Sequence, residues 1–522
     1  MQDKKQRVIV KPIKVNKHMK NIIRMAAVAA AVALSLSACT EKFEEINTDP
    51  DAYSTAPVTN ILGYCIVNMA TNWGDELSHL SDWMGYTALA YDAPTYNILP
   101  TNNEFGNRWY QSYTLYPQLQ DIIDRVDPDE AKNITNVAKL MQTWLLLLAA
   151  DSWGDIPYSE AFQGTTGGEI KPKFDDDYEV YQALEARLKE ISDSWSTGLG
   201  SDDLGEGDFL YGGDAENWQR FCNSLRLRYA MRLSEMPEHK AASEATFKEI
   251  CGNPSKYPVI EDCSQNCEFW WDGSANYRER WYDNSLTRPT DWVMSQMFID
   301  HLKAYDDPRI AVFAQPVAAT GEYRGMVHGP KVNYNGEAYV DYSAVGTKYR
   351  YDAKGSSPYF RACETWFLIA EAAVKGWSVG TTAEQAYNRG VECSFTDNDM
   401  PEQASAYLAG KAKFDGTLDR IYTEEWIGLY KMGQECWALY RRTGYPQILE
   451  LPEVTYYTST TCKQYPGEKS AWGDKHNDIP FRFPYPNNEF TYNEDNVNAA
   501  SKDIVDYVWG KQICWDLRTG VK

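Results

Sequence analysis

The chain has 522 residues, of which 51 are basic and 74 acidic, giving a formal net charge of −23 at neutral pH. Such an acidic chain lacks the basic surface that nucleic-acid phosphates require, which argues against a nucleic-acid-binding protein. It also argues against electrostatic adhesion to anionic lipids.

The first predicted element is a leader at residues 1–38. A basic stretch at 20–24 precedes a run of almost only Ala, Val and Leu at 25–36, and the small residues Ser37-Ala38 follow. This order predicts a signal peptide. Its apolar run is too short to span a membrane, which takes about 20 residues. Translation is expected to start at Met19.

Cys39 directly follows Leu36-Ser37-Ala38, the pattern of a bacterial lipobox. We expect its thiol to be lipidated, the alternative being an ordinary signal peptide followed by an incidental cysteine. Cleavage there leaves 43 basic and 73 acidic residues, a net charge of −30, so the lipid alone would hold the protein to the membrane. Residues 39–60 are expected to form the lipidated tether. Residues 61–522 have no Pro/Ser-rich linker and are expected to form a single domain with helical-repeat and loop-rich parts.

Helical periodicity dominates the chain after the tether. Apolar residues recur at three- and four-residue steps in 178–195 and in 215–236. The clearest unit is 361–395, where one helix ends near Gly376 and Thr382 to Gln385 opens the next as a capping box. Its length is close to the tetratricopeptide period of about 34 residues. We therefore expect a mainly α-helical fold with four tetratricopeptide-like hairpins, made by 103–126 with 131–150, 178–196 with 215–236, 361–395, and 416–432 with 434–443.

Two regions break this periodicity. Residues 255–290 form a Trp/Tyr-rich stretch that we expect to be a loop, and the Gly-, Tyr- and Val-rich residues 316–360 predict short strands and turns. The chain has 18 Trp and 36 Tyr, more than a core needs, because the polar tips of buried Tyr and Trp must find partners. This excess indicates an exposed recognition surface.

No catalytic motif stands out. The six His are scattered, and the chain has no nucleophile elbow, His-Glu-x-x-His, Walker or dinucleotide-binding motif. Acidic residues are so numerous that no glycosidase pair can be singled out. Trp153-Gly154-Asp155 favours a helix stop over a ligand role, because Gly154 allows the turn and Pro157 prevents the helix from resuming.

The cysteines give no metal site. Cys263 and Cys267, four apart, could form a disulfide in an oxidising compartment. As half of a zinc site they lack a further Cys or His at suitable spacing. We expect neither a metal nor a cofactor. Buried positions inside amphipathic helices are expected for Cys222, Cys363, Cys393 and Cys436.

Six motifs follow one another along the chain: the lipobox, Asn47-Thr-Asp-Pro50, Trp153-Gly-Asp-Ile-Pro-Tyr158, Ser224-Leu-Arg-Leu-Arg-Tyr-Ala-Met-Arg-Leu233, Glu435-Cys-Trp-Ala-Leu-Tyr-Arg-Arg-Thr-Gly-Tyr-Pro446 and Arg482-Phe-Pro-Tyr-Pro486. Together they resemble the SusD/RagB family of Bacteroidetes outer-membrane lipoproteins. The Asn-Thr-Asp-Pro tether is most similar to the SusD-like branch of that family.

The resemblance implies a helical fold on four tetratricopeptide-like hairpins, in agreement with the pairings above. It also implies a non-catalytic nutrient-binding protein that delivers glycans or related oligomers to a SusC-like TonB-dependent transporter. Acidic residues after Cys39 (Glu41, Glu44 and Glu45) are similar to the signal that exports such lipoproteins to the cell exterior. A surface glycosidase and a protein-binding scaffold of the uptake complex remain as alternatives.

Ligand sites in this family are typically aromatic arcs on loops outside the repeats. The apolar faces of sugar rings lie on aromatic rings, while their hydroxyls need polar partners. Loops 72–102 and 269–288 have this composition, although packing between loops is the alternative for each aromatic. The candidate ligand-binding residues are Trp73, Trp83, Tyr91, Tyr96, Asn102, Trp270, Trp271, Arg280, Trp281 and Tyr282.

Overall fold

A computed structural model describes residues 56–71, 80–90, 106–164, 167–326, 339–445, 447, 457–458, 463–464, 478–504 and 511–520. The leader, Cys39 and most of the tether lie outside these residues, so the signal peptide and the lipidation stay predictions. Residues Val58–Lys522 group into one compact unit. Among the described helices, none combines the length and the apolar character that crossing a bilayer needs.

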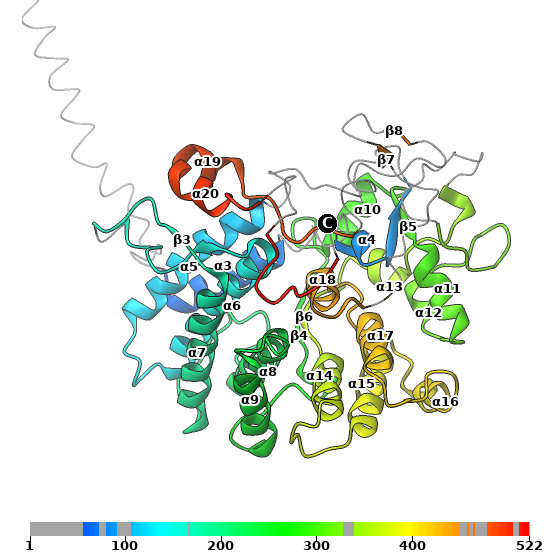
Figure 1. Cartoon of the computed structure of the whole chain (residues 1–522), viewed down its shortest axis with the longest axis horizontal. Helices are drawn as coiled ribbons and strands as arrows, with labels where there is room; N and C mark the ends of the chain where they lie inside the picture. Colours follow the sequence, from blue (N-terminus) through cyan, green and yellow to red (C-terminus); the bar gives the residue numbers. More distant parts are fainter. Residues whose placement is uncertain are drawn as a thin grey trace, which may run out of the picture. The chain divides into compact units, whose positions relative to one another are not determined.

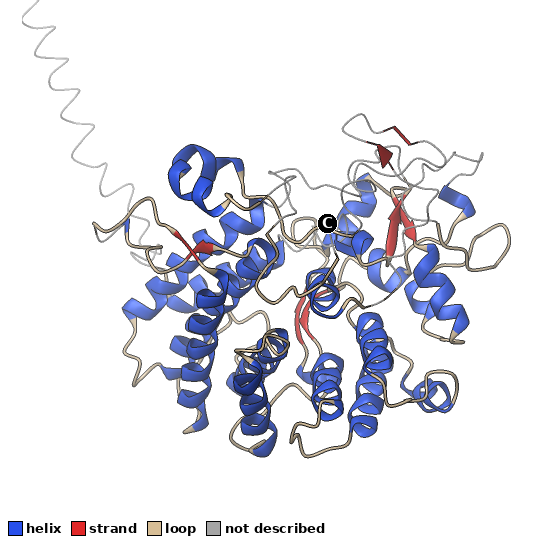
Figure 2. Ribbon diagram, in the orientation of Figure 1, coloured by secondary structure: helices blue, strands red, loops and turns tan. Residues whose placement is uncertain are grey.

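Four helical hairpins follow one another along this unit (Figure 1), and helices far outnumber strands (Figure 2). Helix α6 packs on both α5 and α7, and α8 packs on both α7 and α14, so the hairpins share a core. The predicted pairings and the mainly α-helical class are confirmed. The hairpins are α5 (Gly106–Arg125) with α6 (Lys132–Trp153), α7 (Asp177–Ser196) with α8 (Ala215–Arg232), α14 (Ala362–Val374) with α15 (Ala383–Asp397), and α17 (Leu418–Gly428) with α18 (Gly433–Thr443).

Side-chain caps open four of these helices, as α7 and α15 illustrate. The Asp176 carboxylate accepts hydrogen bonds from the first free backbone N–H groups of α7. Thr382 and Gln385 form the predicted capping box of α15, in which each side chain bonds the backbone of the other residue. Both caps satisfy donors that a helix start leaves without intrahelical partners.

Helix α6 ends at Trp153, as the sequence predicted. Gly154 takes a φ of +73°, a region that glycine enters without a steric penalty. The buried Trp153 indole then donates a hydrogen bond to the carbonyl of Pro484 at 2.9 Å. The Trp-Gly-Asp motif at 153–155 is therefore a helix stop with a tryptophan anchor.

Further helical segments complete the fold. They are α3 (Val58–Thr71), α4 (Ser81–Trp83), α9 (Lys240–Gly252), α10 (Arg280–Thr287), α11 (Gln296–Ala304), α12 (Ile310–Phe313), α13 (Thr347–Arg350), α16 (Ala404–Ala409), α19 (Asn487–Tyr492) and α20 (Glu494–Ala500), with the 3-10 turns η5 (Cys263–Gln265), η6 (Tyr339–Asp341) and η7 (Pro401–Gln403).

The strands form two-stranded antiparallel pairs, of which β4–β6 matters most for function because Trp270 lies opposite Ser356 in it. The prediction of a loop over 255–290 was wrong for β4 and α10. Strand β4 pairs with a segment about ninety residues later, which local sequence patterns do not reveal. The pairs are β1 (Thr87–Leu89) with β5 (Trp292–Met294), β2 (Ile156–Pro157) with β3 (Phe174–Asp175), β4 (Cys267–Trp270) with β6 (Ser356–Phe360), and β7 (Tyr457–Thr458) with β8 (Lys463–Gln464).

Helix α8 buries charged residues as well as apolar ones. Arg226, Arg228 and Arg232 lie away from its apolar stripe, yet each is at most 4% exposed, since neighbouring helices cover more than one face of α8. Arg228 Nε lies 2.5 Å from Glu364 Oε1 on α14, and Arg232 pairs with Asp151 on α6. Ion pairs thus connect three successive hairpins.

Candidate ligand-binding site

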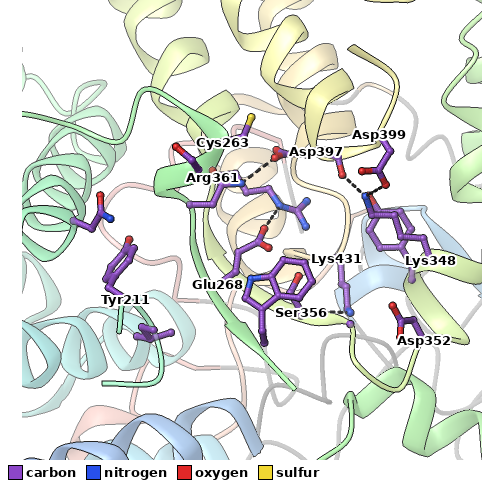
Figure 3. Close-up of a pocket in the computed structure, with 17 residues that line it drawn as sticks. Tyr211, Cys263, Glu268, Lys348, Asp352, Ser356, Arg361, Asp397, Asp399 and Lys431 are labelled. Atoms are coloured by element: carbon purple, nitrogen blue, oxygen red, sulfur yellow. Dashed lines mark hydrogen bonds and ion pairs between the residues drawn. The ribbon is translucent and has the colours of Figure 1, made fainter. Parts of the chain in front are cut away.

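A cavity of about 520 Å³ lies between the second hairpin, the β4–β6 pair and the third hairpin. Its lining comes from the segment that leads into α8, from η5, β4 and α13, from the turn before β6, and from the end of α15 (Figure 3). This volume falls within the range of about 300–1,000 Å³ that is typical of ligand pockets.

Trp270 is an exposed aromatic side chain in this lining. It is 64% exposed, whereas its neighbours Phe269 and Trp271 are buried. Side chains alternate along a strand, so Trp270 points to the face opposite its two neighbours. The Trp271 indole donates to Ser357 Oγ at 3.0 Å inside the core. The end of β4 therefore presents a single indole to the cavity.

Each cation of the cavity is held by a carboxylate. The basic residues come from α13, from the start of α14 and from the turn after α17 (Figure 3). The nitrogen–oxygen distances are 2.9 Å for Arg361 with Glu268, 2.9 Å for Lys431 with Glu279, and 2.7 Å for Lys348 with Asp399.

Two carboxylates of the lining, Asp352 and Asp397, make no ion pair among the described residues. Asp352 is exposed, and its carboxylate accepts a hydrogen bond from the backbone N–H of Lys354 at 2.9 Å. One oxygen of Asp397 accepts a hydrogen bond from the Asn266 side-chain amide at 2.9 Å. The other is buried and makes no hydrogen bond of normal geometry, although the nearby Cys263 thiol stabilises the carboxylate. Burial raises the pKa of Asp397 to about 6, which the nearby Arg361 guanidinium only partly offsets.

Three of the predicted ligand contacts are core residues. Trp83 is 1% exposed and packs edge-to-face on Trp437 with ring centroids 5.3 Å apart. Trp281 is also 1% exposed, and its ring lies under the Lys431 ammonium. Trp271 is buried as described above. Their assignment as ligand contacts is corrected, because packing shields their rings from any ligand.

The other predicted residues fall into two groups. Arg280 and Tyr282 on α10 are partly exposed but do not line the cavity, and Arg280 lies 3.7 Å from Asp283. The rest lie outside the described residues and stay predictions: Trp73, Tyr91, Tyr96 and Asn102.

Sequence reasoning missed the polar residues of the cavity. Lys348, Asp352, Arg361 and Asp397 come from separate segments and follow no recognisable spacing. Only the pairing of β4 with β6 and the packing of α13 and α15 bring them together. Arg361 directly precedes a predicted helix, but nothing in the sequence singles it out.

The cysteines are free thiols in the described chain, and Cys263 and Cys267 form no disulfide. Cys267 is buried on β4, while the Cys263 thiol lies 3.4 Å from the carbonyl oxygen of Cys393. The change of direction from η5 to β4 separates the two side chains. The predicted burial is confirmed for Cys222, Cys363, Cys393 and Cys436.

Within the described part of the chain, one group of acids has oxygens close enough to share a cation: Asp155, Asp176 and Asp177. All three already have partners, Asp176 as the cap of α7. Lys511 donates to Asp155, and the backbone N–H of Cys514 donates to Asp177 at 2.9 Å. Hydrogen bonds within the protein account for this arrangement without an ion.

Comparisons with known proteins cover most of the chain. A family model described as "Starch-binding associating with outer membrane" matches residues 50–486. No curated protein gave a significant match.

Solved structures give close matches in fold. A chitin-binding protein matches with a TM-score of 0.74 and 23% identity over 88% of this chain and 100% of its own. A chitin-binding SusD homolog from Flavobacterium johnsoniae has a TM-score of 0.71 and 22% identity, with 88% and 99% of the two chains covered. A SusD-like protein from Bacteroides thetaiotaomicron has the same score and identity, with 89% and 99% covered. At such identities the likeness shows a shared fold.

Proposed function

The chain belongs to the SusD-like family of starch-binding proteins that associate with the outer membrane, and we propose that it binds glycans or related oligomeric nutrients in the cavity beside Trp270. A lipid on Cys39 holds it to the outer membrane with its binding domain facing the cell exterior. From there it delivers its ligand to a SusC-like TonB-dependent transporter.

The observation that carries this proposal is the exposed Trp270 indole next to a polar cavity. An indole left in water at the end of a strand contributes little to packing, but it offers an apolar plane for the C–H face of a sugar ring. The carboxylates and amides around it can accept and donate hydrogen bonds to hydroxyl groups. This combination suits a carbohydrate better than a wholly apolar ligand.

The acidic residues of the cavity favour binding without hydrolysis. A glycosidase needs two carboxyl groups that flank the scissile bond, one of them with a raised pKa. Asp397 has a raised pKa, but the oxygen that does not bond Asn266 is buried out of reach of solvent. Glu268 is held by Arg361. Neither group is free to act on a glycosidic oxygen, and Asp399 is held by Lys348. Among the lining acids this leaves the exposed Asp352, which cannot form a catalytic pair by itself.

The first experiment measures glycan binding by Trp270→Ala. Oligomers of N-acetylglucosamine are the first probes, because two structural relatives are named for chitin binding. We expect calorimetry to show a loss of about tenfold or more in affinity, as for other exposed aromatic anchors. Tyr492→Ala, which removes an exposed aromatic from α19, is the matched control and should leave affinity unchanged.

Two results would contradict this proposal. One is unchanged affinity in Trp270→Ala for every glycan that the wild type binds. The other is release of reducing ends from a polysaccharide panel by the purified protein, which would favour the surface glycosidase. Trp73→Ala, tested in parallel, asks whether the 72–102 loop contributes to binding.

The proposed anchor and transporter are tested separately. Cys39→Ser should release a folded, ligand-binding protein from the outer membrane and abolish nutrient uptake by cells. The wild type should co-purify with a TonB-dependent transporter from detergent-solubilised outer membranes. Membrane retention of Cys39→Ser would overturn the lipid anchor.

A further inference from the structure

The basic side chains of the cavity are already paired with protein carboxylates. Besides its pair with Glu268, Arg361 donates to the carbonyl of Tyr430 at 3.0 Å. Lys431 donates to the carbonyl of Ser356 at 2.7 Å in addition to its pair with Glu279. An acidic sugar could bind these groups only by displacing a partner that is already in place. The exchange would leave a protein carboxylate without its cation, which is unfavourable in a partly buried site.

The remaining carboxylates make the cavity acidic. Its lining holds four acids and three bases, a formal balance of −1, and Asp352 and Asp397 are the two acids without an ion pair in the described chain. A sugar carboxylate or sulfate beside them would be repelled, and more strongly so where protein replaces water. Ionised carboxylates accept hydrogen bonds but donate none. The exposed Asp352 carboxylate therefore matches the hydroxyl and amine donors of uncharged or aminated sugars, while the buried Asp397 acts on a ligand through its charge.

We propose that the cavity beside Trp270 takes glycans without carboxylate or sulfate groups, and that Asp352 and Asp397 exclude acidic sugars. This inference rests on the proposed function, because it assigns a ligand class to the same cavity. Trp270 supplies the stacking surface that any sugar ring can use. The two acids without ion pairs set the selectivity of the cavity against acidic sugars.

The test compares oligomers of equal length in three charge classes: N-acetylglucosamine and α-1,4-glucose (neutral), glucosamine (cationic) and galacturonic acid (anionic). We expect the wild type to bind a neutral or cationic oligomer at least tenfold more tightly than the galacturonate oligomer. In Asp352→Asn/Asp397→Asn the affinity for galacturonate should rise by about two- to fivefold per removed charge. Asp121→Asn/Asp124→Asn, an equal change of net charge on α5, should change no affinity.

A third variant tests the occupied cations. Asp399→Asn removes the carboxylate that holds Lys348 at 2.7 Å, and so leaves an ammonium group at the edge of the cavity. Affinity for galacturonate should rise severalfold in this variant, while affinity for neutral oligomers stays within about twofold. Because Asp399 is mostly exposed, the gain should shrink at 1 M salt, where charges are screened within about 3 Å.

The outcomes separate this inference from the proposed function. If Trp270→Ala weakens binding but the wild type binds galacturonate as tightly as neutral oligomers, the charge selection is wrong and the binding site stands. The same holds if the double Asn variant keeps the full wild-type discrimination. If Trp270→Ala leaves all affinities unchanged, or if no oligomer binds, the proposed site itself is wrong.

Discussion

Glu364 and Glu371 are buried carboxylates of the hairpins that form ion pairs, whereas Asp397, at the end of α15 and in the cavity wall, forms none among the described residues. In the hairpins, Arg228 Nε lies 2.5 Å from Glu364 Oε1. Both terminal nitrogens of Arg442 donate hydrogen bonds to the Glu371 carboxylate, at 2.6 and 2.7 Å. At the cavity, Asp397 keeps one buried oxygen without a hydrogen bond of normal geometry. An unpaired buried polar group costs stability, and Glu425 on α17 has such an oxygen as well, so what distinguishes Asp397 is its place in the cavity wall.

The largest expected effect concerns the buried ion pair between Arg228 and Glu364. Arg228→Ala should lower the free energy of unfolding by about 3–5 kcal/mol, because it leaves Glu364 buried without its cation. Chemical denaturation measures this loss. Arg389→Ala is the control, since Arg389 forms exposed pairs at 3.4 Å and should lose less than about 1 kcal/mol. Equal losses in the two variants would show that burial of the pair is unimportant.

The next prediction contrasts two tryptophans of the same region. Trp281→Ala should lower the free energy of unfolding by about 3–5 kcal/mol, because it opens a cavity in the core. Trp270→Ala should change it by no more than about 0.5 kcal/mol, since its ring is exposed. Thermal and chemical denaturation of both variants check this. A large loss of stability in Trp270→Ala would assign its indole to packing and remove its proposed role.

The contrast between these tryptophans also shows how far the sequence can predict. The hairpins follow from patterns that act locally, such as the apolar stripes of α7 and α8 and the capping box at Thr382, and these predictions were confirmed. The composition of 269–288 predicted a recognition loop, but it could not distinguish the exposed Trp270 from the buried Trp281. Trp270 and Trp281 differ because β4 pairs with β6 and α10 packs on the core, which are long-range events.

The charges of the molecule were harder to predict for the same reason. Arg228 lies off the apolar stripe of its helix, a position typical of a solvated face, but its partner Glu364 is 136 residues away in sequence. Asp397 and Asp352 belong to elements that meet only in the folded chain. A single sequence indicates which faces are apolar, whereas the pairing of charges depends on tertiary packing.

The third prediction concerns the pH dependence of Asp397→Asn. The pKa of Asp397 rises from its ordinary value of 3.8 to about 6 on folding. Between these values the folded protein holds a proton that the unfolded chain has lost, so this group's contribution to stability declines as the pH rises from about 4 to about 6. Relative to the wild type, the variant should gain about 1–3 kcal/mol over that interval.

Urea denaturation of both proteins at steps between pH 4 and pH 7 measures this difference. The pH-dependent contributions of the groups that the two proteins share cancel in the comparison. Glu402→Asn, an exposed acid on η7, is the control and should show no such trend. A constant difference between wild type and Asp397→Asn would mean that this carboxyl is not strained by burial. The comparison with the paired acids of the hairpins would then fail.

The smallest expected effect tests a local interaction of the third hairpin. Thr382→Ala removes the side chain that accepts the backbone N–H of Gln385 at 3.2 Å, and it should lower the free energy of unfolding by about 1 kcal/mol. Thr396→Ala makes the same chemical change near the end of α15, where alanine suits the helix, and should be neutral or stabilising. Because the cap lies on an exposed helix end, glycan affinity should be unchanged in both variants. A loss of affinity in Thr382→Ala would show that the start of α15 is coupled to the Asp397 end of the same helix, so that the hairpins help to shape the cavity.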